Sequence, residues 1–355
     1  MRMKIQTNLK RSVTKAYQML CIILSAFCIC SCQNRHKGTD MQFAVTENLT
    51  AAEEIDLEKW SILLPSHLVV TADRIVVVEC DNDNHVSVFD KEFRLLFRKG
   101  MTGQGPQEFI QIFSVGMLND DEIGLYDANL GVMRRMNIKD STMLMTNCLR
   151  NARFRHQVLP VAEGRFLAVN THADHAFEML DAEGCILDSL AYWPPKPEGV
   201  SDFTHRLACT GPMALSPDKE RFVKATWADG AIEFFRIEGD RLSHQKRTGF
   251  FDMDYGVEHA EVDLPQSNER TRKGYTNVTY SRNAVWATFS GNSIDEKSPS
   301  YELHQYTWDG EPVKRFLLDK PSGKICYDDA AHALYCLGNL SAGESVVRIY
   351  RMLEE

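Results

Sequence analysis

The chain has 355 residues, of which 44% are hydrophobic, 25% charged and 10% aromatic. These proportions belong to ordinary globular proteins and exclude a collagen, a coiled coil and a largely disordered chain. The formal net charge of −9 argues against non-specific binding to nucleic acid, so no nucleic-acid partner is expected. The length allows two modest domains or one large domain built from repeats.

The N-terminal segment is predicted to be a secretory signal peptide over residues 1–31. Residues 2–15 contain five basic side chains and no acidic one, and residues 19–30 are apolar apart from Ser25. A basic stretch followed by about a dozen apolar residues is typical of secretory signals. The alternative, an N-terminal anchor helix, is disfavoured because a membrane-spanning helix needs about 20 apolar residues.

The end of this segment, Ile29-Cys30-Ser31-Cys32, resembles the lipobox of bacterial lipoproteins. An aliphatic residue lies three positions before Cys32, and a small residue lies directly before it. The resemblance implies that the Cys32 thiol receives a lipid and that cleavage leaves this cysteine as the new N-terminus. The protein would then be attached to a membrane through its N-terminal lipid. The alternative is an ordinary cysteine near a cleavage site.

The segment 32–54 is predicted to comprise the lipidated cysteine and a flexible tether, because residues 33–50 are polar and show no periodic pattern. Some Bacteroidetes lipoproteins carry an acidic cluster directly after the lipidated cysteine and are exported to the cell exterior. Residues 33–37 are basic instead, which by this resemblance favours the outer membrane on the side that faces the periplasm. The expected location is therefore the bacterial cell envelope.

Residues 55–355 are predicted to form an all-β fold, a six-bladed β-propeller with four-stranded antiparallel blades. Beyond residue 60, almost every apolar run is four to eight residues long and is bounded by Gly, Pro, Asn or Asp, as in β-strands. One strand–strand–turn–strand unit recurs six times, with steps of about 45 residues and longer steps where loops intrude, which fits propeller blades. A β-sandwich and two small barrels are the alternatives. The equivalent positions of the six units are Phe89, Met136, Leu180, Ile237, Trp308 and Ile349.

Two segments resemble a known family. The run Gly103-Gln104-Gly105-Pro106-Gln107-Glu108-Phe109 is similar to the Gly-x-Gly-Pro-x-Glu-Phe segment of Bacteroidetes six-bladed β-propeller lipoproteins, the TolB-like and NHL-like group. Residues 273–291 are similar to a late blade of that group. The resemblance covers residues 55–353 and implies a propeller fold and a cell-envelope location, but little about an activity.

The glycine-rich segment 100–109 is the first candidate binding site. Gly103 and Gly105 permit a positive φ or a close approach of the backbone, and Gln104 or Glu108 can hydrogen-bond a ligand. The segment is not a phosphate-binding P-loop, because no Gly-Lys-Ser/Thr follows. The alternative is a tight crossover between blades, since Gly and Pro mark turns.

The polar insertion 252–275 is the second candidate binding site. Arg270, Arg272 and Tyr275 can contact an anionic or sugar ligand through charge and ring stacking. Loops on a rigid scaffold are where binding residues concentrate. The alternative is a solvated connector between the fourth and fifth blades.

No metal, cofactor or catalytic group is predicted. Residues 81–84 (Asp-Asn-Asp-Asn) resemble the start of a calcium loop, but Val86 occupies the position that requires Gly, so a hairpin turn is expected. His172 and His175, with Asp174, can hold zinc only if a fourth group arrives. The chain also lacks the H-E-x-x-H and G-x-S-x-G signatures of hydrolases.

The cysteines beyond the signal are expected to be free, buried thiols, because a large domain needs no disulfides to hold its core. They are Cys80, Cys148, Cys185, Cys209, Cys326 and Cys336. Cys326 and Cys336 are the best candidate pair for a disulfide, provided that they lie on adjacent strands.

These features predict a lipid-anchored propeller of the cell envelope that binds a ligand or a protein at one face. The expected ligand is a glycan or another small molecule, and the expected protein partner is an envelope component. The alternative is a propeller enzyme, a lyase or a hydrolase, that uses His172, His175 or His259 with a carboxylate in the central funnel. An enzyme predicts converging titratable side chains in the funnel, whereas a binding module predicts aromatic and amide side chains.

Overall fold

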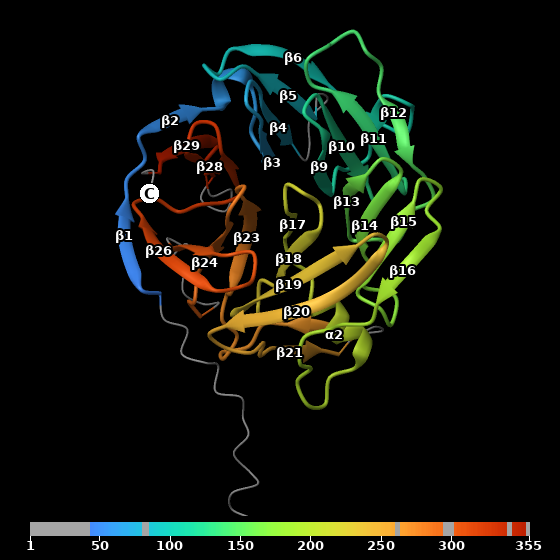
Figure 1. The fold of residues 1–355 in the computed structure, drawn as a ribbon, viewed down its shortest axis with the longest axis vertical. Helices are drawn as coiled ribbons and strands as arrows, with labels where there is room; N and C mark the ends of the chain where they lie inside the picture. Colours follow the sequence, from blue (N-terminus) through green and yellow to red (C-terminus); the bar gives the residue numbers. More distant parts are fainter. Residues whose placement is uncertain (1–42, 80–84, 260–262, 294–301, 339–342, 353–355) are drawn as a thin grey trace, which may run out of the picture. The chain divides into compact units, whose positions relative to one another are not determined.

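The computed structural model describes residues 43–79, 85–259, 263–293, 302–338 and 343–352. Within them, six β-sheets are arranged in a ring, and each sheet is one blade of a propeller (Figure 1). The prediction of a six-bladed all-β propeller is confirmed. The predicted signal peptide, Cys32, Cys80 and the turn at residues 81–84 lie outside the described residues.

The strands of each blade follow one another from the centre of the ring outwards. Blade 1 contains β3 (Pro65–Val70), β4 (Ile75–Glu79), β5 (Val86–Phe89) and β6 (Leu95–Lys99). Blade 2 contains β9 (Ser114–Asn119), β10 (Glu122–Asp127), β11 (Val132–Asn137) and β12 (Thr146–Leu149). Blade 3 contains β13 (Gln157–Ala162), β14 (Arg165–Val169), β15 (Phe177–Asp181) and β16 (Ile186–Leu190).

The three remaining blades repeat this order, and two of them also use N-terminal strands. Blade 4 contains β17 (Met213–Leu215), β18 (Arg221–Ala225), β19 (Ala231–Glu238) and β20 (Arg241–Gly249). Blade 5 contains β23 (Tyr275–Tyr280), β24 (Val285–Phe289), β25 (Glu302–Tyr306), β26 (Pro312–Leu318) and, outermost, β1 (Val45–Leu49). Blade 6 contains β27 (Ile325–Asp328), β28 (Ala333–Leu337), β29 (Val346–Arg351) and β2 (Glu53–Asp56).

The ring is closed by pairing its two chain ends. Strand β2 is antiparallel to β29, with Glu53 opposite Ile349 and Asp56 opposite Val346. Arg348 strengthens this contact by donating to the Glu54 carboxylate at 2.6 Å. Within the described residues, each blade then keeps an unpaired edge only at its innermost and its outermost strand, and leaving only such short edges is how propellers protect their sheets.

Blade 5 departs from the four-stranded antiparallel pattern. Its fifth strand, β1, is parallel to β26, with Val45 opposite Lys314 and Leu49 opposite Leu318. The segment 32–54 was predicted to be a tether, but residues 45–49 and 53–54 belong to strands. Phe43 packs on His304 with ring centroids 4.5 Å apart. The Phe43 ring also contacts the rings of Phe250 and Tyr306. Backbone pairing and these aromatic contacts order a polar segment that has no periodicity of its own.

In strands inside a blade, such as the second strand, alternate side chains pack against the preceding blade and the following blade. This two-sided packing explains the continuous apolar runs in the sequence. In β4, Ile75 and Val77 belong to a core shared with blade 6, whereas Val76 and Val78 belong to a core shared with blade 2. All five β4 residues are buried. Because a blade has two packed faces, it reads as an unbroken apolar run rather than as an alternating strand.

Short elements occupy the connections that lead from the outermost strand of one blade to the innermost strand of the next. They are η1 (Glu58–Trp60), the parallel pair β7 (Met101–Thr102) and β8 (Glu108–Phe109), α2 (Asp202–Ala208), and the hairpin β21 (Gly256–Glu258) and β22 (Leu264–Gln266). Helix α2 begins after Ser201, whose hydroxyl accepts from the Thr204 backbone N–H as an N-cap. A small core that includes Ala208, Met253 and Tyr255 joins α2 to the hairpin segment.

Candidate functional site

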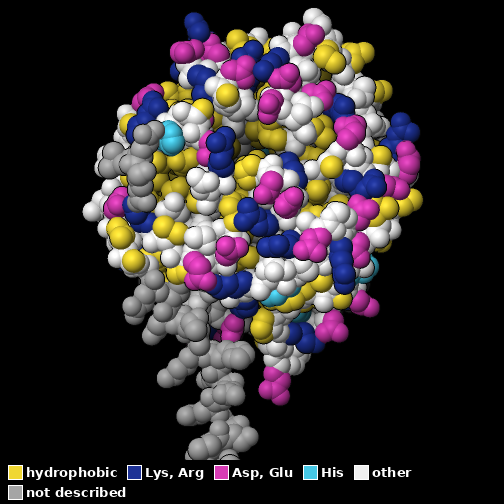
Figure 2. Space-filling model, in the orientation of Figure 1, with side chains coloured by type: hydrophobic (Ala, Val, Ile, Leu, Met, Phe, Trp, Pro, Cys, Tyr) yellow, Lys and Arg dark blue, Asp and Glu magenta, His cyan; other side chains and the backbone are white. Residues whose placement is uncertain are grey.

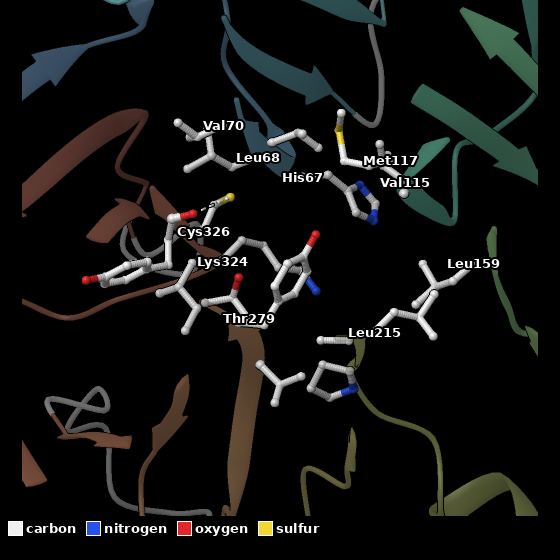
Figure 3. A pocket seen from close by; sticks show the side chains of 18 of the residues that line it. His67, Leu68, Val70, Val115, Met117, Leu159, Leu215, Thr279, Lys324 and Cys326 are labelled. Atoms are coloured by element: carbon white, nitrogen blue, oxygen red, sulfur yellow. Dashed lines mark hydrogen bonds between the residues drawn. The ribbon is translucent and has the colours of Figure 1, made fainter. Parts of the chain in front are cut away.

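The six innermost strands surround a cavity of about 870 Å³ on the axis of the ring. Figure 2 shows a hollow lined with hydrophobic side chains on the face in view, and Figure 3 shows the cavity from close by. A cavity of this size falls in the range that encloses a drug-sized ligand. Its lining residues come from all six blades, so no single blade contains the site.

The cavity has two chemically different ends. All blades share one strand order, so the innermost strands run in the same direction and begin at one end of the cavity. We name this the loop end, because the connections between blades, including residues 100–113 and 250–274, arrive there. At the other end, the hairpin end, each innermost strand turns back into the second strand of its blade. Both loops singled out in the sequence therefore belong to the same face.

A ring of equivalent residues occupies the loop end, one on or directly before each innermost strand. The equivalence follows from register, because each residue pairs with or is hydrogen-bonded to the same position of the second strand. This loop-end ring consists of His67, Ser114, Gln157, Pro212, Asn277 and Lys324. Five of the six line the cavity, whereas the Ser114 hydroxyl donates to the carbonyl of Val158 in the next blade.

The wall becomes apolar in the middle of the cavity and charged at the hairpin end. Three positions further along each strand, a second ring is dominated by apolar and aromatic groups, some of which Figure 3 labels. It consists of Val70, Met117, Pro160, Leu215, Tyr280 and Tyr327. The charged lining residues of the hairpin end are Asp73, Asp120, Lys139, Lys219, Arg282, Asp328 and Asp329.

His67 is held neutral, with both ring nitrogens engaged. Its Nε2 lies 3.2 Å from the Phe113 carbonyl oxygen, which can only accept, so Nε2 carries the proton. Nδ1 is then an acceptor 3.0 Å from the Ser66 hydroxyl, whose single proton also has the Val78 carbonyl oxygen as an acceptor at 3.1 Å. Burial, with a smaller effect of the Lys324 charge, lowers the pKa of His67 to about 3. This ring therefore shapes the wall instead of exchanging protons at physiological pH.

His156 and Lys324 supply the polar groups that face the loop end. His156 directly precedes β13, and its ring is exposed in the cavity with no hydrogen-bond partner in the described part of the chain. Desolvation, and then the charges of Lys224 and Lys324, lower the pKa of His156. Its neutral ring carries one donor and one acceptor. Lys324 directly precedes β27 and brings a positive charge to the same end.

Two amides and two aromatic rings complete the loop end. Among the described residues, Nδ2 of Asn277 and Oε1 of Gln157 have no hydrogen-bond partner. Asn277 is only 5% exposed, and an unsatisfied buried polar group costs about 1–3 kcal/mol. Phe113 and Trp227 line the same end, and the indole of Trp227 is 37% exposed. The loop end therefore combines the aromatic and amide groups expected of a binding module with the titratable side chains of His67, His156 and Lys324.

A buried ion-pair cluster braces the turn that carries Trp227. Arg247 donates to both carboxylate oxygens of Asp229 at 2.9 Å and to Glu233 at 2.7 Å. Burial raises the pKa of Asp229 to about 6, although Arg247 favours its carboxylate. The Trp227 carbonyl accepts from the N–H of Gly274, where a Cβ would lie 1.7 Å from the Asp229 carbonyl oxygen. The Trp227 turn and the connection to blade 5 are therefore locked together.

The glycine-rich segment 100–109 is braced internally. The Glu108 carboxylate accepts from the Gly105 N–H at 2.7 Å, and Arg134 of blade 2 donates to the carbonyls of Gly105 and Pro106. Gly103 has φ +152° and faces the same carboxylate, whereas Gln104 is exposed. No residue of this segment lines the cavity. These contacts account for the sequence pattern as a crossover, and a ligand at its surface stays a prediction.

The three candidate residues of the insertion differ in how deeply they are buried. Arg270 and Arg272 are exposed, with Arg270 Nε 3.5 Å from Asp254 and Arg272 over the Phe251 ring. Tyr275 is fully buried and hydrogen-bonds His304 Nδ1 at 3.1 Å and the Tyr306 hydroxyl. We therefore remove Tyr275 from the candidate binding surface, because its ring has no surface to offer. Sequence reasoning placed it in the loop, but it begins the innermost strand β23.

The histidines considered for catalysis lie away from the cavity lining. His175 Nε2 donates to the Glu178 carboxylate at 2.8 Å within blade 3. The ring of His172 packs between Phe154 and Phe203, and His259 pairs with Asp263 on the surface. Across the described ranges, no group of three or more His, Cys, Asp or Glu side chains is placed to hold a metal.

Cys326 and Cys336 are free thiols. They do lie on adjacent strands, but Cys326 is opposite Tyr335 and Cys336 is opposite Ile325. An offset of one residue turns the two side chains to opposite faces of the sheet. The best candidate disulfide is therefore not formed. Cys148, Cys185 and Cys209 are also free, as expected, but the expectation of burial is wrong for Cys185, which is exposed, and Cys148 is only partly buried.

The TolB-like six-bladed propeller model matches residues 44–330 of this chain. The chain belongs to the TolB-like six-bladed propeller family. A search of curated proteins found no match. No helix in the described residues is long and apolar enough to cross a membrane.

Solved structures with the same fold are distant in sequence. A member of the duf4221 family from Bacteroides vulgatus has 10% identity and a TM-score of 0.58, covering 87% of this chain and 99% of its own. A putative exported protein from Bacteroides fragilis has 11% identity and a TM-score of 0.54, covering 88% and 99%. At such identities the likeness supports the propeller fold of this family member and nothing finer.

Proposed function

We propose that this TolB-like propeller is a lipid-anchored protein of the bacterial cell envelope that binds a small molecule in its central cavity. The observation that carries the proposal is the cavity of about 870 Å³, whose loop end gathers polar and aromatic side chains from separate blades. A concave, partly apolar cavity with a few converging polar groups is the usual form of a small-molecule site.

The chemistry of the loop end favours binding over catalysis. His67 uses both ring nitrogens on protein groups, and the acidic residues of the cavity lining belong to the hairpin end. His156 therefore faces no carboxylate within the cavity lining of the described residues. General acid–base catalysis needs a positioned proton donor or acceptor at the reacting atoms. Catalysis by a histidine–carboxylate pair in the funnel is accordingly the weaker candidate.

The envelope location rests on sequence and on one relative. Residues 1–32 have the pattern of a signal peptide that ends in a lipobox. The similar structure from Bacteroides fragilis is described as a putative exported protein. A propeller exported in this way would be held at the membrane by the lipid on Cys32, with its cavity free to meet small molecules in the periplasm.

The test is a fragment screen by ligand-observed NMR on the purified propeller and on Thr276→Trp. Thr276 is exposed and lines the loop end, so the added indole should occupy the cavity mouth. The substitution also removes a hydrogen bond to the buried Thr288 hydroxyl, so circular dichroism must first show that the variant is folded. Thr142→Trp is the matched control, because Thr142 is exposed outside the cavity lining. Fragments that bind the parent and the control but not Thr276→Trp support the proposal. Binding that survives Thr276→Trp unchanged, or no binding at all, contradicts it.

A further inference from the structure

We propose that the ligand of the central cavity is an organic anion with an apolar body, whose anionic group is held at the loop end by Lys324. The inference rests on the proposed function and specifies the ligand class of that site. It follows from how charge, polarity and shape are distributed along the cavity.

Charge is distributed unevenly along the cavity. Lys324 is the charged member of the loop-end ring, and the acidic lining residues all belong to the turns of the hairpin end. At the hairpin end, opposite charges lie close together, as in the pair of Lys139 and Asp121 at 2.6 Å. An anionic group therefore meets the positive charge of Lys324 at the loop end, whereas at the hairpin end it meets four carboxylates beside three basic side chains.

The uncharged polar groups of the loop end suit an anion as well. His156 offers a ring N–H, and Asn277 retains an amide N–H without a partner among the described residues. Hydrogen bonds from such donors to an ionised acceptor are roughly twice as strong as bonds between neutral groups. A cationic ligand would instead meet Lys324 and would leave these donors unused.

The middle of the cavity fits an apolar body. Directly beyond the loop-end ring, the wall carries Leu159, Leu215, Val70, Val115 and Met117, which come from four different blades (Figure 3). These side chains surround the space that a ligand must enter once its anionic group reaches Lys324. Transfer of apolar surface from water into such a space contributes about 25 cal/mol per Å². A purely polar anion would forgo that contribution.

The loop end also offers a stacking surface. The exposed indole of Trp227 and the ring of Phe113 line the loop end of the cavity, and the Phe113 ring lies edge-on to the His156 ring with centroids 6.4 Å apart. Aromatic rings of this kind pack against flat or ring-shaped apolar groups. The fitting ligand is therefore a carboxylate or a similar anion attached to an apolar chain or ring.

The experiment compares three probes that share one apolar body and differ only in the head group: 4-phenylbutyrate, 4-phenylbutanol and 4-phenylbutylamine. Binding to the full propeller is measured by isothermal titration calorimetry at neutral pH. We expect the acid to bind about tenfold more tightly than the alcohol, because it adds a charge-assisted hydrogen bond, and we expect the amine to bind most weakly.

Two matched lysine variants locate the head group. Lys324→Gln should weaken binding of the acid about tenfold and leave binding of the alcohol within about twofold. Lys139→Gln removes the same charge from the hairpin end of the same cavity, so it should change binding of the acid by less than about twofold. A larger loss in Lys139→Gln than in Lys324→Gln would place the anion at the wrong end and overturn the inference.

Failure of the ligand class and failure of the proposed function give different results. If the alcohol or the amine binds as tightly as the acid, and Thr276→Trp abolishes that binding, the cavity binds small molecules but the anionic class is wrong. If none of the three probes binds the folded propeller, the ligand class is also wrong. The fragment screen with Thr276→Trp then decides separately whether the cavity binds any other molecule.

Discussion

The Glu108 carboxylate accepts a hydrogen bond from the N–H of Gly105 and also fills the space where a side chain at Gly103 would lie. The first contact measures 2.7 Å, and a Cβ on Gly103 would approach the same carboxylate oxygen to 2.1 Å. The Glu108 side chain therefore folds back onto the backbone of its own segment, which connects blades 1 and 2. This contact explains the glycines of the segment without reference to a ligand.

Gly103→Ala is expected to destabilise the propeller by about 2–4 kcal/mol, because the new Cβ strains a positive φ and displaces Glu108 from its charge-assisted hydrogen bond. The free energy of unfolding in urea measures the effect. Gly164→Ala is the control, since Gly164 has φ +65° but no atom within 4 Å of its Cβ position. Equal losses in both variants would show that the contact with Glu108 contributes nothing.

Two chain truncations test whether β2 closes the ring. A protein that starts at residue 51 loses Phe43 and β1 but keeps β2, and we expect it to lose about 2 kcal/mol of stability or less. A protein that starts at residue 57 also loses β2, which leaves β29 as an open edge and should at least double that loss. Thermal unfolding followed by circular dichroism compares them. Similar midpoints for the two truncations would contradict the closure.

His67 makes stability depend on pH. Its folded pKa of about 3 lies below the ordinary value of 6.5, so the unfolded chain takes up the proton first on acidification. The stability that neutral His67 contributes is complete above about pH 6.5 and is lost as the pH falls towards 3, by up to about 1.4 kcal/mol per pH unit. We expect His67→Gln to flatten this part of the stability curve.

The control for this prediction is His172→Gln, because His172 is an exposed histidine of blade 3 outside the cavity. Urea unfolding between pH 4 and pH 7 should give the same slope for this variant as for the parent. If His67→Gln keeps the parent's slope as well, burial of His67 is not what couples stability to pH.

Lipid attachment at Cys32 is tested with an alkyne-labelled fatty acid in cells that express the full chain. We expect the parent to incorporate label and to fractionate with membranes, and Cys32→Ala to do neither. Cys185→Ala is the matched control, because Cys185 is a free, exposed cysteine of the propeller. Undiminished label in Cys32→Ala would rule out this cysteine as the site of attachment.

Local pattern was sufficient to predict the second and third strands of every blade. Residues 75–78 of β4 are all apolar because each face of the blade packs on another blade. Burial of both faces therefore produces an apolar run that can be recognised in the sequence. The positions Phe89, Met136, Leu180, Ile237 and Ile349 all lie on third strands, and Trp308 follows one closely. Repetition of one buried unit is therefore readable without coordinates.

The innermost strands were missing from the predicted unit because they obey a different constraint. Their side chains face neighbouring blades and also a cavity, so polar residues such as His67 and Asn277 interrupt the apolar runs. A weak signal existed, since a polar residue directly precedes an apolar one at Gln157, Asn277 and Lys324. A polar residue followed by an apolar one also occurs where ordinary strands begin, so local spacing does not identify these positions as cavity-lining.

The amino-acid sequence by itself determined the six-bladed architecture and supports the expectation of an exported, lipidated N-terminus, because both depend on runs of neighbouring residues. Only the tertiary structure decided which residues form the site. His67 and Lys324 are 257 positions apart in the chain and meet only when β2 pairs with β29. A cavity on the axis of a closed ring has no local sequence pattern, since each blade contributes only a few of the lining residues, and their chemistry becomes meaningful only beside those of the other five blades.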